Sequence, residues 1–153
     1  MYPVSDVELV ARLILAAVLG FLIGLEREFR GQAAGERTHA LVALGAAAFA
    51  LLSGWAFPGA DTARVAAGVV TGIGFLGAGM ILKREGERIE GLTTAAGLWA
   101  VGSIGLAIGA GMYLLGTVTA ALVGLILMAE SILRLDERLE RRRGRGEGKG
   151  PPG

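Results

Sequence analysis

Residues 7–25, VELVARLILAAVLGFLIGL, form an apolar stretch that is long enough to cross a membrane as one helix. Four similar stretches follow, at His39–Phe57, Val65–Leu82, Thr93–Gly109 and Met112–Ile132. A helix rises about 1.5 Å per residue, so each stretch approaches the roughly 30 Å thickness of a hydrocarbon core. We therefore predict an all-α integral membrane protein with five transmembrane helices.

Lys and Arg residues are distributed unevenly among the segments that connect these stretches. Three lie in residues 26–38, three in residues 83–92 and seven after Ile132, whereas Arg12 and Arg64 lie toward the opposite ends of the stretches. Connections rich in Lys and Arg remain in the cytoplasm. The pattern predicts an N-terminus outside and a C-terminus in the cytoplasm of a bacterial cell, with the protein crossing the inner membrane several times.

The chain divides into a membrane domain, residues 1–133, and two short C-terminal segments. Leu135 and Leu139 continue a helical spacing from Ile132, which predicts a cytoplasmic helical extension over residues 134–143. That extension either anchors the last span or docks a partner or anionic lipid through Arg141–Arg143. Residues 144–153, GRGEGKGPPG, are expected to be disordered. No basic segment precedes residue 7, so we expect the first stretch to be a retained span and not a signal peptide.

The composition narrows the function classes. The chain has 153 residues, 53% of them hydrophobic, no cysteine and one histidine, His39. A thiolate nucleophile and a cysteine-ligated metal are excluded, and no nucleophile–base pair or metal-ligand spacing is visible. No ionisable residue lies near the middle of any stretch, which argues against a proton relay through carboxylates. We expect no enzyme, no resident metal or cofactor and no nucleic-acid partner.

Small residues recur every fourth position in each stretch. In a bilayer such stripes allow helix backbones to approach closely. Two interpretations remain open, packing within the chain or homo-oligomerisation through one leftover stripe. The glycine members include Gly20-xxx-Gly24, Gly68-xxx-Gly72 and Gly105-xxx-Gly109.

The third stretch carries four glycines in eight residues, at Gly72, Gly74, Gly77 and Gly79. Glycine weakens a helix in water by about 1 kcal/mol relative to alanine. The block therefore predicts either tight helix packing or a local break that exposes backbone groups to a cavity, as in transporter half-helices. In the second case Thr71 and these glycines would line an ion pathway.

Charged and polar residues concentrate at the predicted inner face. Glu26-Arg27-Glu28 ends the first stretch and Arg37-Thr38-His39 begins the second. One histidine with scattered carboxylates is weak evidence for a metal site, so we expect an interfacial, hydrogen-bonded His39.

Three blocks of residues resemble the MgtC/SapB family of bacterial inner-membrane proteins. The resemblance covers residues 9 to 130, with the blocks in the family's order. The first block is Gly20-xxx-Gly24-Leu25-Glu26-Arg27-Glu28 with Gly35-x-Arg37-Thr38-His39. The second is Gly72–Gly79, and the third is Gly91-Leu92-Thr93-Thr94-Ala95-Ala96-x-Leu98-Trp99 with Ile104-Gly105.

The resemblance implies a role in survival at low magnesium. Members are associated with virulence and, in the best-known case, with inhibition of the F-type ATP synthase, and many are regarded as magnesium transporters. This chain has Thr93 where that member has Asn and Ala100 where it has Cys. It resembles a short form without the C-terminal soluble domain, so only the membrane domain's properties are carried over.

Two functions follow from these observations. The first is regulation of a membrane-protein partner, or support of magnesium homeostasis, through contacts at Glu26, Arg27, Glu28, Arg37, Thr38, His39, Thr93, Thr94 and Trp99. The alternative is a Mg²⁺ transporter or channel that uses the third stretch, in which Mg²⁺ is the transported or sensed ion.

Overall fold

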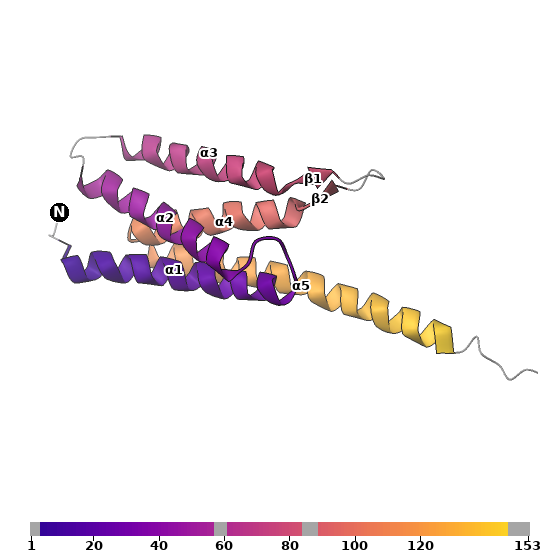
Figure 1. Cartoon of the computed structure of the whole chain (residues 1–153). Coiled ribbons are helices and arrows are strands. Elements are labelled where there is room, and N and C mark those ends of the chain that lie inside the picture. The colour runs from indigo at the N-terminus through magenta and orange to yellow at the C-terminus, as the bar shows by residue number, and fades with distance from the viewer. Residues whose placement is uncertain (1–3, 57–60, 84–88, 147–153) are drawn as a thin grey trace, which may run out of the picture.

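The computed structural model describes residues 4–56, 61–83 and 89–146, in which five helices are joined by short connections (Figure 1). The helices are α1 (Asp6–Phe29), α2 (Glu36–Trp55), α3 (Thr62–Met80), α4 (Leu92–Gly109) and α5 (Tyr113–Gly146). The predicted five-helix, all-helical fold is confirmed. Between α3 and α4 two short strands that the sequence did not predict, β1 (Leu82–Lys83) and β2 (Ile89–Glu90), pair antiparallel.

Helices α1 to α4 are each long and apolar enough to span a membrane. The apolar part of α5, Tyr113–Ala129, is shorter than these four. Helix α5 continues through residues 134–143 and ends at Gly146. The last residues of the segment expected to be disordered, 147–153, lie outside the described residues.

The bundle has two distinct ends (Figure 1). One, which we call the hairpin end, contains the α1–α2 connection (residues 30–35) and the β1–β2 pair, and the C-terminal part of α5 projects beyond it. The opposite end, which we call the N-terminal end, contains the start of α1 and the α4–α5 turn (residues 110–112). The end of α2 and the start of α3 lie there too.

Local sequence signals fix where the helices begin. The Ser5 hydroxyl accepts a hydrogen bond from the Glu8 amide at 3.3 Å, and the Asp61 carboxylate accepts one from the Ala63 amide at 3.0 Å. Both cap donors that a first helical turn leaves unpaired. Helix α4 instead follows Gly91, whose φ of 90° lies in the left-handed region. A Cβ at Gly91 would also clash with the Met80 carbonyl oxygen, so a larger residue is excluded there.

Helix α2 packs between α1 and α4, and glycines make both approaches close. At these glycines a Cβ atom would overlap the α2 backbone or an α2 side chain. The pairs are Gly20 with His39 and Ala43, Gly24 with Glu36, Gly105 with Ala43 and Ala46, and Gly109 with Ala47 and Ala50. Aliphatic residues complete the core around these contacts, among them Ala16, Val101, Ile104 and Ile108.

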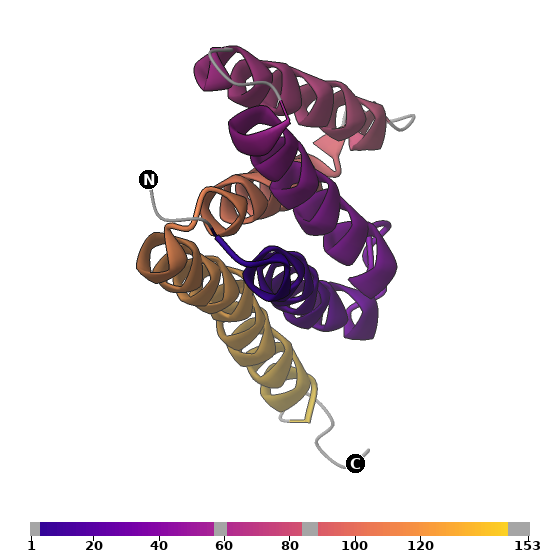
Figure 2. The ribbon, with the colours of Figure 1, turned by 90° about the vertical axis from the view of Figure 1, so that its left-hand side faces the viewer.

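Helix α3 lies at the edge of the bundle (Figure 2). Within its apolar window 11% of the residues are buried, against 50% for α4. It is one uninterrupted helix from Thr62 to Met80, so the alternative of a broken third span is wrong. The backbone groups of its glycine block are hydrogen-bonded within the helix, which removes the reason to place an ion beside them.

Tight packing does not explain most of the α3 glycines either. Gly77 alone of the block contacts a neighbour, with Ala95 of α4 about 3.5 Å from the position of a Cβ. At Gly68, Gly72, Gly74 and Gly79 a Cβ would meet no atom within 4 Å. Gly68 and Gly72 instead line an open apolar groove of about 830 Å³ between α2 and α3, together with Gly45 and Phe49.

Candidate functional site

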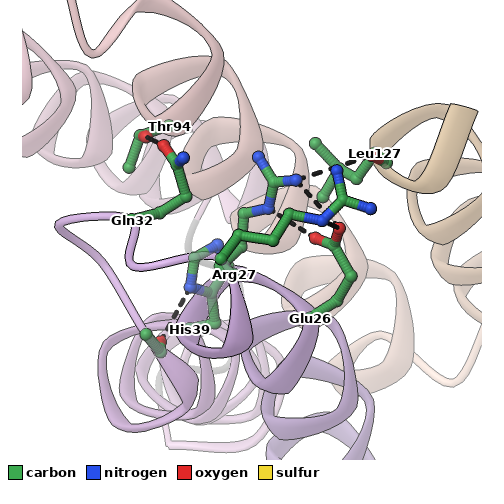
Figure 3. Close-up of polar contacts among 8 residues, drawn as sticks. Glu26, Arg27, Gln32, His39, Thr94 and Leu127 are labelled. Carbon is green, nitrogen blue, oxygen red and sulfur yellow. Dashed lines mark hydrogen bonds and ion pairs between the residues drawn. The ribbon is translucent and has the colours of Figure 1, made fainter. Parts of the chain in front are cut away.

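Arg27 is the centre of a buried polar cluster at the hairpin end (Figure 3). Only 1% of this residue is exposed. Its Nε donates a hydrogen bond to Oε2 of Glu26 at 2.5 Å, and its Nη2 donates to Oε1 of Glu26 at 3.0 Å. Nη2 also lies 3.5 Å from the carbonyl oxygen of Leu127, on α5. Glu26 forms a second ion pair with Arg30, so one carboxylate balances two guanidinium groups.

The burial of Arg27 follows from its position on α1. Gly20, Gly24 and Arg27 recur at intervals of four and three residues, which places them on one face of a helix. That face packs against α2 through the two glycines, and it carries Arg27 inward beside α5. A cation held away from water requires a paired carboxylate, and Glu26 supplies it.

His39 lies in the same cluster with 0% of its surface exposed. Its Nδ1 is 2.9 Å from the carbonyl oxygen of Gly35, and because a carbonyl only accepts, Nδ1 is the donor. Nε2 is buried without a hydrogen-bond partner among the described residues. Gly97 of α4 lies beside the ring, since a Cβ there would be 3.7 Å from Nε2, an ordinary van der Waals contact. The expected hydrogen bond of His39 is present at Nδ1, and the residue is buried inside the bundle at the start of α2.

Thr94 and Gln32 connect the α1–α2 connection to α4. Thr94 is 2% exposed, and its hydroxyl donates to the side-chain oxygen of Gln32 at 3.3 Å (Figure 3). The cluster therefore joins α1, α2, α4 and α5 at one end of the bundle. It is suited to fix the relative positions of these helices. Within the described residues, no group of three or more His, Cys, Asp or Glu side chains could hold a metal ion.

The structure brings together four of the residues predicted to contact a partner, Glu26, Arg27, His39 and Thr94. The remaining residues predicted to contact a partner are exposed on the surface, namely Glu28, Arg37, Thr38, Thr93 and Trp99. Trp99 lies on α4 and is 53% exposed. Of the residues proposed for an ion pathway, Thr71 donates its hydroxyl to the Ala67 carbonyl of its own helix at 2.9 Å.

A second polar cluster, which the sequence did not single out, lies at the N-terminal end. Arg12 is 9% exposed and donates to the Tyr113 hydroxyl at 2.9 Å, to the Gly109 carbonyl at 3.1 Å and to Glu8 at 2.5 Å. The Tyr113 hydroxyl donates to the same Glu8 oxygen at 3.0 Å. Only the Glu8–Arg12 spacing of four residues is visible in the sequence as a signal.

A comparison with known proteins identifies the family of this chain. The model of the MgtC family matches residues 13–135. The chain belongs to the MgtC family. No solved structure matches it significantly.

Three relatives illustrate the range of the MgtC family. The Escherichia coli (strain K12) protein named "Putative magnesium transporter YhiD" is 47% identical over 128 residues, which are 78% of this chain and 59% of that protein. Protein MgtC of Salmonella typhimurium (strain LT2) is 45% identical over 130 residues, 84% of this chain and 55% of that protein. Protein MgtC of Brucella abortus (strain 2308) is 52% identical over 97 residues, 63% of this chain and 40% of that protein. The chain thus spans about half the length of these relatives.

Proposed function

We propose that this MgtC-family protein supports magnesium homeostasis in the bacterial inner membrane by regulating a membrane-protein partner. The hairpin end faces the cytoplasm and provides the contact. The name of the YhiD relative supports the link to magnesium. The concentration of Lys and Arg at the hairpin end supports the orientation.

The observation that carries the proposal is the pair of exposed side chains beside the buried cluster. The side chain of Arg37 is 91% exposed at the start of α2, and Phe29 is 86% exposed at the end of α1. Arg and aromatic residues are enriched among the energetically dominant positions of protein interfaces. The cluster beneath holds the two helix ends in place, so both side chains are presented from a fixed backbone. A partner with acidic and apolar groups would complement them.

Charge reversal at Arg37 tests this proposal. Arg37→Glu should reduce both copurification of membrane partners after cross-linking and growth at low magnesium, because the acidic partner surface would then meet a like charge. Arg64→Glu is the matched control, since Arg64 is exposed at the opposite end of the bundle. If Arg37→Glu leaves both partner binding and growth unchanged, the proposed contact is wrong.

Transport of Mg²⁺ is the second candidate, favoured by the name of the YhiD relative. The unbroken α3 and the apolar lining of the α2–α3 groove do not support a pathway there. We expect proteoliposomes that contain the purified chain to take up no more Mg²⁺ than empty liposomes do. Uptake that Gly74→Leu abolishes would instead support transport along α3, because that substitution has free space and should not disturb folding.

A further inference from the structure

A second cavity, of about 640 Å³, opens at the N-terminal end between α2, α3, α4 and the start of α5. We call it the Ser53 cavity. Apolar residues, many of them Ala or Gly, form most of its wall, and its polar lining consists of Arg12, Ser53, Trp55, Thr62 and Ser103. It is separate from the cluster at the hairpin end. Its size is within the range of small-molecule sites, roughly 300–1,000 Å³.

Ser53 lines this cavity, and its buried hydroxyl is unused. The residue is 3% exposed, and its Oγ has no hydrogen-bond partner within the described part of the chain. Other hydroxyls on these helices bond to carbonyls of their own helix, as Thr71, Ser103 and Thr117 do. A buried hydroxyl without a partner is costly. The exception at Ser53 therefore points to a group that enters the cavity and bonds to it.

Arg12 is the charged side chain that lines the cavity, and its ion pair with Glu8 leaves some of its donors unused. Of the five N–H groups of a guanidinium, three are used by Tyr113, Gly109 and Glu8, so two have no acceptor among the described residues. No carboxylate is among the described residues that line the cavity. A cation is therefore disfavoured in the cavity, whereas a group rich in acceptor oxygens would satisfy both Arg12 and Ser53.

The surroundings indicate where such a group comes from. Trp55 lines the cavity and is 41% exposed at the end of α2, and tryptophan is enriched where a membrane meets water. Phospholipid phosphates lie at this depth, and the apolar wall suits the adjoining glycerol and acyl carbons. We propose that the Ser53 cavity binds a phosphate group, held by Arg12 and the Ser53 hydroxyl and supplied by a membrane phospholipid.

Lipid titration followed by native mass spectrometry tests the proposal. The full chain, in a sugar detergent that lacks phosphate, is titrated with phosphatidylglycerol or with diacylglycerol of the same chains. We expect phosphatidylglycerol to bind about tenfold more tightly than diacylglycerol, as one hydrogen bond to a charged group allows. Ser53→Ala should remove most of that preference. Thr71→Val, which deletes a hydroxyl outside the cavity, should retain it.

A second variant, and inorganic phosphate as a second ligand, distinguish the possible results of this experiment. Ala63→Leu places a larger side chain in the cavity from an exposed position and should also abolish the preference. If millimolar inorganic phosphate alone raises the Tm of the wild type but not of Ser53→Ala, the cavity binds phosphate but its source is free phosphate. Equal binding of both lipids to the wild type, with no Tm shift in phosphate, would mean that the cavity does not recognise phosphate and would overturn the proposal.

Discussion

Arg27 shows how one residue can determine the geometry of a helix end. Its guanidinium is nearly inaccessible and contacts both the carboxylate of Glu26 and a main-chain carbonyl of α5. Breaking a buried ion pair leaves a charge without compensation, and this is more damaging than removing an exposed pair. Arg30 uses the same carboxylate but remains partly exposed. The two arginines therefore differ in environment while sharing one partner.

We predict that Arg27→Met lowers the free energy of unfolding by about 2 kcal/mol, because the buried hydrogen bonds to Glu26 and to the Leu127 carbonyl are lost while Glu26 keeps Arg30 as its partner. Arg30→Met is the matched control and should cost about 1 kcal/mol or less, since that pair is partly solvated. Titration with SDS in mixed micelles measures both values. Equal losses for the two variants would contradict the assigned role of Arg27.

The sequence predicted which residues form the buried cluster better than it predicted their burial. Glu26, Arg27, His39 and Thr94 were identified as site residues, but as contacts for a partner. The burial of Arg27 could have been inferred from its helical spacing to Gly20 and Gly24, which form a packing stripe. The Gln32–Thr94 bond could not, because those residues are 62 positions apart and only the fold brings them together.

Among the elements, α2 depends on close approach from both sides. A methyl group at Gly105 would overlap the Ala43 carbonyl, whereas one at Gly72 would meet nothing within 4 Å. We predict that Gly105→Ala lowers the free energy of unfolding by about 2 kcal/mol through overpacking. Gly72→Ala, the same chemical change on α3, should be neutral or slightly stabilising. Thermal unfolding in detergent compares the two, and a similar Tm loss for both would contradict the packing described here.

Two glycine stripes show what residue spacing alone cannot predict. Gly105-xxx-Gly109 and Gly68-xxx-Gly72 have the same pattern, yet one packs on α2 and the other lines an open groove. Periodicity identifies a face of a helix but not its neighbour. The neighbour depends on how all helices are arranged, which no single stretch encodes. For the same reason the unbroken course of α3 could not be inferred from its glycine content.

For the whole molecule, the positions of the two ends allow a direct test of orientation. The chain has no cysteine, so each introduced cysteine is the only thiol. We predict that Arg64→Cys reacts with a membrane-impermeant maleimide added to intact spheroplasts. Arg37→Cys should react only after the membrane is permeabilised. The reverse pattern would invert the orientation, and labelling of both from one side would contradict the opposite placement of these residues.

Arg12 and Arg27 lie at the two ends of the buried face of α1. They are 15 residues apart, or about 22 Å along a helix axis. Each contacts a carbonyl of another helix, Gly109 of α4 for Arg12 and Leu127 of α5 for Arg27. A piston movement of α1 by one turn would break both contacts at once. A displacement of α1 that preserves both contacts must therefore carry the contacted parts of α4 and α5 with it, which links the two ends of the bundle through one helix.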